Sequence, residues 1–143
     1  MKREQLAVTL YSVRDLLKTR DGIRSTLEQL ADIGYPAVQV SAVSWDVISP
    51  EELAELCADV GLSICATHEP GDVLIGEPHT AINRIRALGC RATAYPFPGG
   101  VELGETSAVD AWIDQLEQSA RALGEAGITL TYHNHHVEFR QIE

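Results

Sequence analysis

The segment ADIGYPAVQV, residues 31–40, passes from a helical pattern through a glycine into a short apolar run. The same arrangement recurs three more times, in ADVGLSICAT (58–67), RALGCRATAY (86–95) and GEAGITLTYH (124–133). In each copy the glycine stands where a left-handed residue ends a helix and lets the chain turn into a sheet. The repeating unit is therefore a helix, a glycine and a strand.

The spacing of these units predicts a parallel α/β fold. The four glycines stand at positions 34, 61, 89 and 127, which gives spacings of 27, 28 and 38 residues, and a (β/α)8 barrel averages about 31 residues per unit. Strands that alternate with helices of this length favour parallel crossovers over hairpins. We expect about five βα units in a single α/β domain over residues 1–143, each close in length to the unit of a (β/α)8 barrel.

Apolar runs and helical periodicity locate the individual elements. Ser49 is suited to cap a helix whose first residue is Pro50, and residues 96–104, PFPGGVELG, are expected to form a loop. The expected strands cover residues 6–11, 37–41, 63–67, 92–95 and 128–133, and the expected helices cover 21–33, 49–60, 77–88 and 107–126.

Composition and charge narrow the class of protein. The chain is 45% hydrophobic and 22% charged, which is ordinary for a globular domain. A net charge of −10 would repel a phosphate backbone, so nucleic acid is not expected as a partner. No run reaches the length of a transmembrane helix or a signal-peptide core, so we expect no membrane association and a cytoplasmic location. The cysteines lack C-x-x-C spacing and are expected to be buried thiols: Cys57, Cys65 and Cys90.

Polar and aromatic residues gather after the predicted strands. Parallel α/β folds bind ligands at the carboxyl ends of their strands, where the loops converge. Four of the five histidines and one of the two tryptophans fall on this rim. The rim residues, strand by strand, are Tyr11, Ser12, Arg14 and Asp15; Ser44, Trp45 and Asp46; His68 and Glu69; Tyr95 and Phe97; His133, Asn134, His135, His136 and Glu138.

Three of these rim segments carry a resemblance to a known family. They are LYSVRD (residues 10–15), ATHEP (66–70) and, most specifically, YHNHHVEF (132–139). With them the chain resembles the xylose-isomerase-like TIM barrels, which include sugar phosphate isomerases/epimerases and the related apurinic endonucleases. The resemblance extends over the whole chain and covers the first five strands of a family barrel. It therefore implies an incomplete (β/α)8 barrel of the TIM type, a partial xylose-isomerase-like domain over residues 1–143.

The resemblance also implies a metal site. In the family a divalent metal is held by a glutamate from about the fifth strand and by an aspartate, a histidine and a glutamate from later strands. Only the first of these has a candidate in this chain, Glu138. Nitrogen and oxygen donors suit Mn, Zn, Co or Mg, so we expect a divalent metal in the complete enzyme and weak or absent binding by this chain. Glu138 as an exposed loop carboxylate is the structural alternative.

The histidines are candidates for substrate contact. His133 and His135 lie two residues apart and would share one face of a continuing strand. His68 ends an apolar strand and either contacts substrate or makes a structural hydrogen bond. Tyr11 and Trp45 either form a wall for a sugar ring or cap the barrel. The remaining histidines are expected in solvent and the second tryptophan in the core: His79, His136 and Trp112.

These expectations give one leading function and two alternatives. The leading one is the N-terminal part of a metal-dependent sugar or polyol isomerase, epimerase or dehydratase that abstracts a proton next to a carbonyl and is inactive in isolation. The first alternative is a non-catalytic half-barrel that binds a small ligand or forms a homo-oligomer to cover two open sheet edges and an apolar barrel face. The second, action on abasic DNA, conflicts with the charge of −10.

Overall fold

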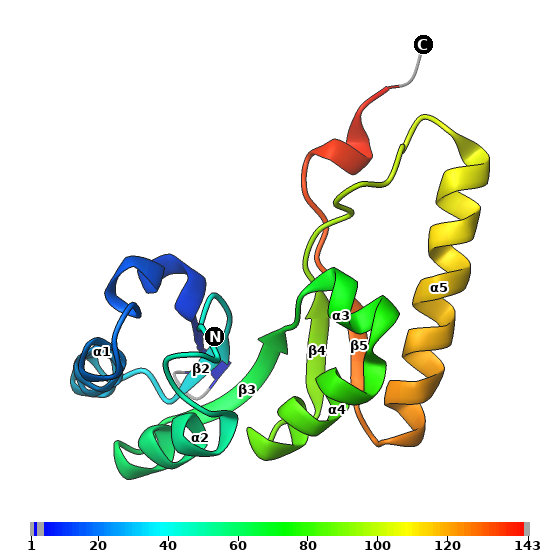
Figure 1. Cartoon of the computed structure of the whole chain (residues 1–143). Coiled ribbons are helices and arrows are strands. Elements are labelled where there is room, and N and C mark those ends of the chain that lie inside the picture. The colour runs from blue at the N-terminus through cyan, green and yellow to red at the C-terminus, as the bar shows by residue number, and fades with distance from the viewer. Residues whose placement is uncertain (1, 3–4, 142–143) are drawn as a thin grey trace.

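The predicted parallel sheet is present in the computed structural model, which describes residue 2 and residues 5–141. Five strands pair in parallel in the order β1-β2-β3-β4-β5, so each strand lies beside the next one in sequence (Figure 1). Right-handed crossovers in such an order place all helices on one side of the sheet. The strands are β1 (Val8–Thr9), β2 (Ala37–Val40), β3 (Ser63–His68), β4 (Ala92–Tyr95) and β5 (Thr129–Tyr132).

The helices lie between the strands as the periodicity predicts. Ser49 caps α2 as expected, because its hydroxyl accepts from the Glu52 N–H and the Glu52 carboxylate accepts from the Ser49 N–H. All four repeat glycines have positive φ, between 68° and 100°, as required to end the helices. The helices are α1 (Arg20–Ile33), α2 (Pro50–Asp59), α3 (Gly71–Gly76), α4 (Pro78–Ala87) and α5 (Thr106–Glu125), with 3-10 turns η2 (Leu10–Leu16) and η3 (Val137–Phe139).

Two elements differ from the sequence prediction. The first strand was expected over residues 6–11 but covers only Val8–Thr9, because the chain turns into η2 at Leu10. There the Tyr11 N–H donates to the Ser41 hydroxyl instead of a strand neighbour. Helix α3 was not predicted, since six residues are too few to show a helical period.

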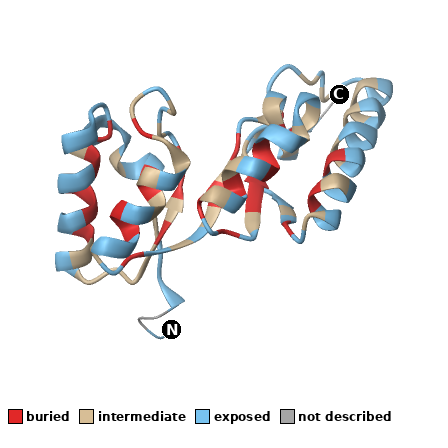
Figure 2. Ribbon diagram, turned by 60° about the horizontal axis from the view of Figure 1, so that its bottom comes forward, coloured by how far each residue is buried: buried red, intermediate tan, exposed pale blue. Residues whose placement is uncertain are grey.

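The core lies between the sheet and the helices. Buried aliphatic side chains line the inner face of each helix. Figure 2 colours the buried residues red, and they form bands along the helix ribbons. On β2, Val38 and Val40 are buried, whereas Gln39 between them is only partly so. The central side chains, none of them exposed, are Leu10, Ile23, Leu27, Val38, Leu53, Leu74, Ile85 and Leu123.

The face opposite the helices differs from the apolar barrel face expected from the sequence. Strand register aligns two rows of residues on it, one of Thr9, Gln39 and Ala66 and the other of His68, Ala94 and Thr131. These side chains are small or polar because strands alternate their side chains, and the aliphatic ones point to the helices. We call this the open face.

Two of the three cysteines are buried, as predicted. Cys57 and Cys90 are buried, and burial raises the pKa of the Cys57 thiol to about 12. Cys65 is exposed, contrary to the prediction. It lies where the register between β2 and β3 shifts, and its thiol donates to the Val38 carbonyl oxygen. In the part of the chain that the structure describes, no helix combines the length and the apolar character needed to cross a bilayer.

The start of α3 packs closely against the end of β4. Alanine substitutions at the two glycines of α3 should therefore change the free energy of unfolding by different amounts. A Cβ at Gly71 would lie 2.8 Å from Cζ of Tyr95, a ring that is 4% exposed. Gly71→Ala should therefore lower the free energy of unfolding by about 1–3 kcal/mol. Gly76→Ala meets nothing within 4 Å and should be neutral or stabilise by up to about 1 kcal/mol. Urea denaturation measures both, and equal effects would contradict the close contact.

The sheet edges predict self-association of the isolated chain. β1 and β5 each pair on one side only among the described residues. Edge N–H and C=O groups pair readily with another chain, so sedimentation equilibrium should find a dimer or larger species. Thr129→Lys, at an exposed position of β5, should shift the equilibrium toward monomer. A monodisperse monomer that unfolds cooperatively would rule this out.

Candidate functional site

The structure brings together three of the histidines that follow the strands. Nε2 of His68, at the end of β3, lies 3.3 Å from Nδ1 of His133, just past β5. The rings of His133 and His135 stack at 4.7 Å with an interplanar angle of 4°, and the His68 ring lies 4.9 Å from that of His133. The three imidazoles form a row at the carboxyl end of the sheet, which we call the histidine row.

Backbone contacts hold the histidine row beyond the end of β5. The His133 N–H donates to the Tyr95 carbonyl oxygen at 3.0 Å and extends the pairing with β4 by one residue. Thr131, two residues earlier on the same face, donates its hydroxyl to the Thr93 carbonyl oxygen. The His135 ring meets Phe97 edge-on at 5.0 Å. The β4 strand and the loop after it therefore support the histidines that follow β5.

The electrostatics of the histidine row favour a neutral His68 ring. Partial burial, and then the neighbouring His133 and His135, hold the pKa of His68 below its ordinary value. A neutral imidazole has one donor and one acceptor nitrogen, so one ring of the His68–His133 pair donates to the other. Each ring then keeps one nitrogen for another partner.

Glu138, the predicted metal ligand, is held by its own segment. The Tyr132 hydroxyl donates to one carboxylate oxygen, and the His135 N–H donates to the other at 3.0 Å. Partial burial alone would raise the pKa of this carboxyl, but the hydrogen bonds from Tyr132 and His135 bring it below its ordinary value. The burial and the hydrogen bond to Glu138 also raise the pKa of Tyr132.

The donor groups of the site suit a divalent metal only in part. An ionised carboxylate suits Mn, Zn, Co or Mg, so Glu138 fits as one ligand. Within residues 5–141, no three His, Cys, Asp or Glu side chains are arranged to hold an ion. The structure therefore offers one fitting oxygen donor and a nearby row of imidazoles.

Tyr11 and Trp45 are engaged by arginines. The guanidinium of Arg14 lies over the exposed ring of Tyr11, 4.4 Å from its centroid. The guanidinium of Arg84 lies 5.1 Å from the ring centroid of Trp45, which is half-buried against the core. Neither ring makes a described contact with the histidine row, and a role as a wall for a sugar ring stays a prediction from their rim position.

A buried ion pair beside the histidine row was missed by the sequence analysis. Glu69 is 1% exposed, and its carboxylate lies 2.5 Å from Nη1 of Arg84 on α4. Burial raises the pKa of Glu69, and Arg84 opposes but does not cancel that shift. The glutamate was visible after an apolar strand, but its partner stands fifteen residues later on a helix, so no local spacing reveals the pair.

Aromatic side chains support the same end of the sheet on its helix side. The Trp112 ring lies 5.7 Å from both Tyr95 and Tyr132, and the two tyrosines stack at 6.1 Å. Trp112 is partly buried against the core, as expected, and its indole N–H has no partner among the described groups. His79 and His136 are exposed, as expected.

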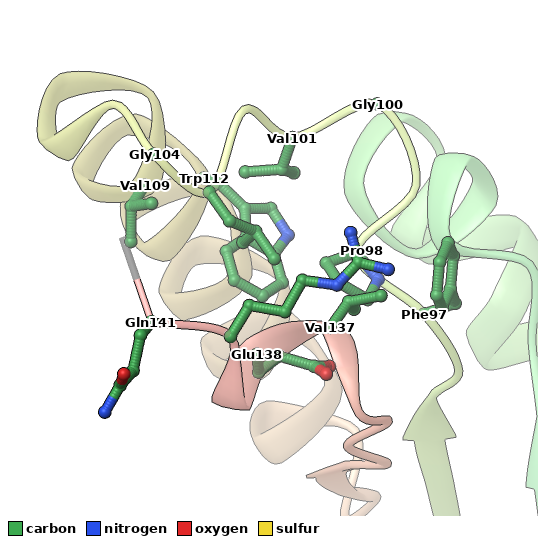
Figure 3. Close-up of a pocket in the computed structure, with 12 residues that line it drawn as sticks. Phe97, Pro98, Gly100, Val101, Gly104, Val109, Trp112, Val137, Glu138 and Gln141 are labelled. Atoms are coloured by element: carbon green, nitrogen blue, oxygen red, sulfur yellow. The ribbon is translucent and has the colours of Figure 1, made fainter. Parts of the chain in front are cut away.

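A pocket of about 750 Å³ lies beyond Trp112. Figure 3 shows the Trp112 indole between the loop that carries Val101 and the segment that carries Val137 and Glu138. The wall combines residues 97–104, the start of α5 and residues 137–141, and none of the three histidines lines it. The pocket and the histidine row are therefore separate features that share the Glu138 segment.

The comparisons with known proteins concern the fold. The chain aligns with a sugar phosphate isomerase/epimerase from Parabacteroides distasonis (TM-score 0.73, 20% identity) over 96% of its own length and 53% of that protein. It aligns with L-ribulose 3-epimerase (0.70, 20%) over 87% and 48%, and with a family 2 AP endonuclease from Brucella melitensis (0.65, 14%) over 88% and 53%. No protein-family model and no curated protein sequence matches the chain.

These similarities define the class. The chain has the fold of the xylose-isomerase-like TIM barrels, and the expectation of an incomplete (β/α)8 barrel is confirmed. It spans about half the length of the solved structures that it matches.

The hydrogen bonds to Glu138 predict a change in its titration. Tyr132→Phe removes one donor, so the pKa of the Glu138 carboxyl should rise toward its ordinary value. A lowered folded-state pKa gives stability that is present above the unfolded-state pKa and is lost as the pH falls through the folded one. The variant should therefore lose less stability on acidification. Carboxyl carbon NMR reports the pKa, Tyr11→Phe at an exposed tyrosine is the control, and an unchanged value would contradict the hydrogen bond.

Proposed function

We propose that the chain forms the N-terminal half of a barrel enzyme that isomerises, epimerises or dehydrates a sugar or polyol. The observation that carries the proposal is the approach of His68 to His133, 3.3 Å apart at the carboxyl ends of β3 and β5. Ligands of such barrels bind at that end. Structures with this fold include a sugar phosphate isomerase/epimerase and L-ribulose 3-epimerase, which favours a small sugar as substrate.

The histidine row would bind the hydroxyl and carbonyl oxygens of the substrate. A lowered pKa keeps His68 neutral near pH 7, so its ring can take part as a donor or as an acceptor. His133 and His135 add ring nitrogens on the same side. The small Ala94 and the hydroxyl of Thr131 on the open face leave space for a polar ring next to His68.

Glu138 would supply one ligand to a divalent metal. Two hydrogen bonds keep its carboxylate ionised, which is the state that coordinates a metal. Such an ion, when bound, polarises a substrate carbonyl and stabilises the negative charge that develops when a neighbouring proton leaves. One carboxylate falls short of the usual ligand set, so we expect this chain alone to bind metal weakly. Action on DNA is disfavoured by the net charge of −10.

Activity measurements test the proposal. The 143 residues alone should fail to interconvert ketose sugars with added Mn, because partial removal of a catalytic unit removes nearly all of its rate. The chain extended by the remaining strands of its barrel should turn over, and His133→Ala or Glu138→Gln should then reduce turnover by about 10²-fold or more. His136→Ala, at an exposed histidine of the same motif, is the matched control.

Two results would contradict the proposal. Robust metal-dependent epimerisation by the isolated chain would show a complete site within it, and full activity of His133→Ala in the extended chain would remove the histidine row from the mechanism. Binding offers an independent readout, because millimolar ketose should shift the ring NMR signals of His68 and His133. The exposed His79 is the internal reference in that titration.

A further inference from the structure

The last residues of β3 alternate between the two faces of the sheet. Thr67 and Glu69 point to the helix side and are 0% and 1% exposed. His68 between them lies on the open face, in the row with Ala94. The two neighbours of this histidine are therefore both buried polar residues, and each must find a partner inside the protein.

Both neighbours of His68 are anchored by side-chain contacts. The hydroxyl of Thr67 donates to that of Thr93 at 2.8 Å, and Thr93 donates to the Thr67 carbonyl oxygen at 3.2 Å. The carboxylate of Glu69 accepts from Arg84 on α4, at 2.5 Å. The Arg84 side chain is itself 16% exposed and lies over the ring of Trp45. A chain of contacts thus runs from Trp45 through Arg84 and Glu69 to the backbone beside His68.

The turn that follows leaves little freedom. Pro70 has φ of −55° and accepts the Leu74 N–H as α3 begins. Gly71 lies against the Tyr95 ring. Within residues 67–69, His68 alone has its side chain on the open face. Its ring orientation therefore depends on how the flanking residues are fixed.

The ion pair is a costly way to achieve stability alone. A carboxylate buried with one arginine loses much of its hydration, and apolar residues of similar shape often stabilise as well or better. The raised pKa of Glu69 shows that its burial outweighs the attraction of Arg84. We therefore look for the effect of the Glu69–Arg84 pair in the groups that it orients, and not in the stability that it adds.

We propose that Glu69 and Arg84 are positioning residues for the histidine row. By fixing the backbone after β3, the pair directs the His68 ring toward His133 and sets the 3.3 Å contact between them. Arg84 acts through Glu69 and stacks on Trp45, which assigns Trp45 to the support of the site. The orientation of His68 by this pair can be tested in this chain alone, whereas an effect of the pair on turnover rests on the proposed function.

The test compares three variants of the chain by NMR of the histidine rings. In the native chain, the ring nitrogens of His68 and His133 should show one fixed tautomer each and a ring-to-ring nuclear Overhauser effect. Arg84→Met should remove that effect and move both rings toward the averaged shifts of a free imidazole. Arg84→Lys, which restores the charge, should recover part of it. Arg20→Met, which removes an exposed ion pair with Glu52, should leave the rings unchanged.

Glu69→Gln covers the case in which Arg84→Met does not fold. It keeps the shape and a neutral acceptor for Arg84, and it should shift the His68 signals in the same direction by a smaller amount. Native His68 and His133 signals in the folded Arg84→Met chain, or in Glu69→Gln where the first is unfolded, would overturn the assignment. A purely structural role would lower stability without moving the rings.

A second measurement separates this inference from the proposed function. In the chain extended to a complete barrel, Arg84→Met should lower turnover by up to about 10²-fold and no further than His68→Ala does. If His68→Ala leaves turnover intact while the ring signals move as expected, the positioning role stands and the proposed role of His68 fails. If the rings do not move while His68→Ala abolishes turnover, the positioning role fails and the proposed function stands.

Discussion

The junction between β3 and β4 holds the sheet in register and positions the histidine row. Two residue pairs, Thr67 with Thr93 and His68 with Ala94, form its described ladder, and it joins the β1–β2 part of the sheet to the β4–β5 part (Figure 1). The two threonines are fully buried and hydrogen-bond to each other. A buried polar pair that is satisfied in one register is unsatisfied in any other. The junction therefore fixes how far β3 advances relative to β4, and so where His68 meets the residues after β5.

The two faces of this sheet carry different chemistry for one physical reason. Helices cover one face, so its polar groups need internal partners, and Thr67, Thr93 and Glu69 all have them. The open face carries the small or polar residues of the two register rows. The histidine row belongs to the open face, whereas Glu69 and Arg84 support it from the helix side. Because side chains alternate along a strand, the end of β3 supplies both the candidate ligand-binding residue His68 and the buried Glu69 that supports it.

The chain covers only part of the barrels that it matches, and its described residues contain few candidate metal ligands. The chain spans about half of the solved barrels that it matches, and its sheet has unpaired edges at β1 and β5 among the described residues. Glu138 stands at the β5 end with both oxygens accepting hydrogen bonds from its own segment. A divalent ion needs several donors from different strands of a barrel. Under the proposed function, Glu138 would be the one metal ligand that these five strands supply.

Local patterns in the sequence were enough to predict the class of fold and the end of the sheet where the candidate site lies. The glycines at 34, 61, 89 and 127 revealed the repeat because a left-handed helix end is a local requirement. The rim position of His68 and His133 followed from the strand ends. Helix α3 and the early end of β1 could not be predicted, since both are short and depend on packing around Leu10, Ser41 and Tyr95. The exposure of Cys65 depended on a register shift that no local pattern shows.

Which residues meet across the sheet follows from the folded chain and not from local patterns. The 3.3 Å approach of His68 to His133 joins positions 65 residues apart, and the pairing of Glu69 with Arg84 joins a strand end to a helix. The hydrogen bond from Tyr132 to Glu138 arises from a turn of the chain after β5. Local sequence sets the conformation of a residue through its own backbone and its near neighbours. Contacts between distant segments depend on register and burial, which exist only once the whole sheet has formed.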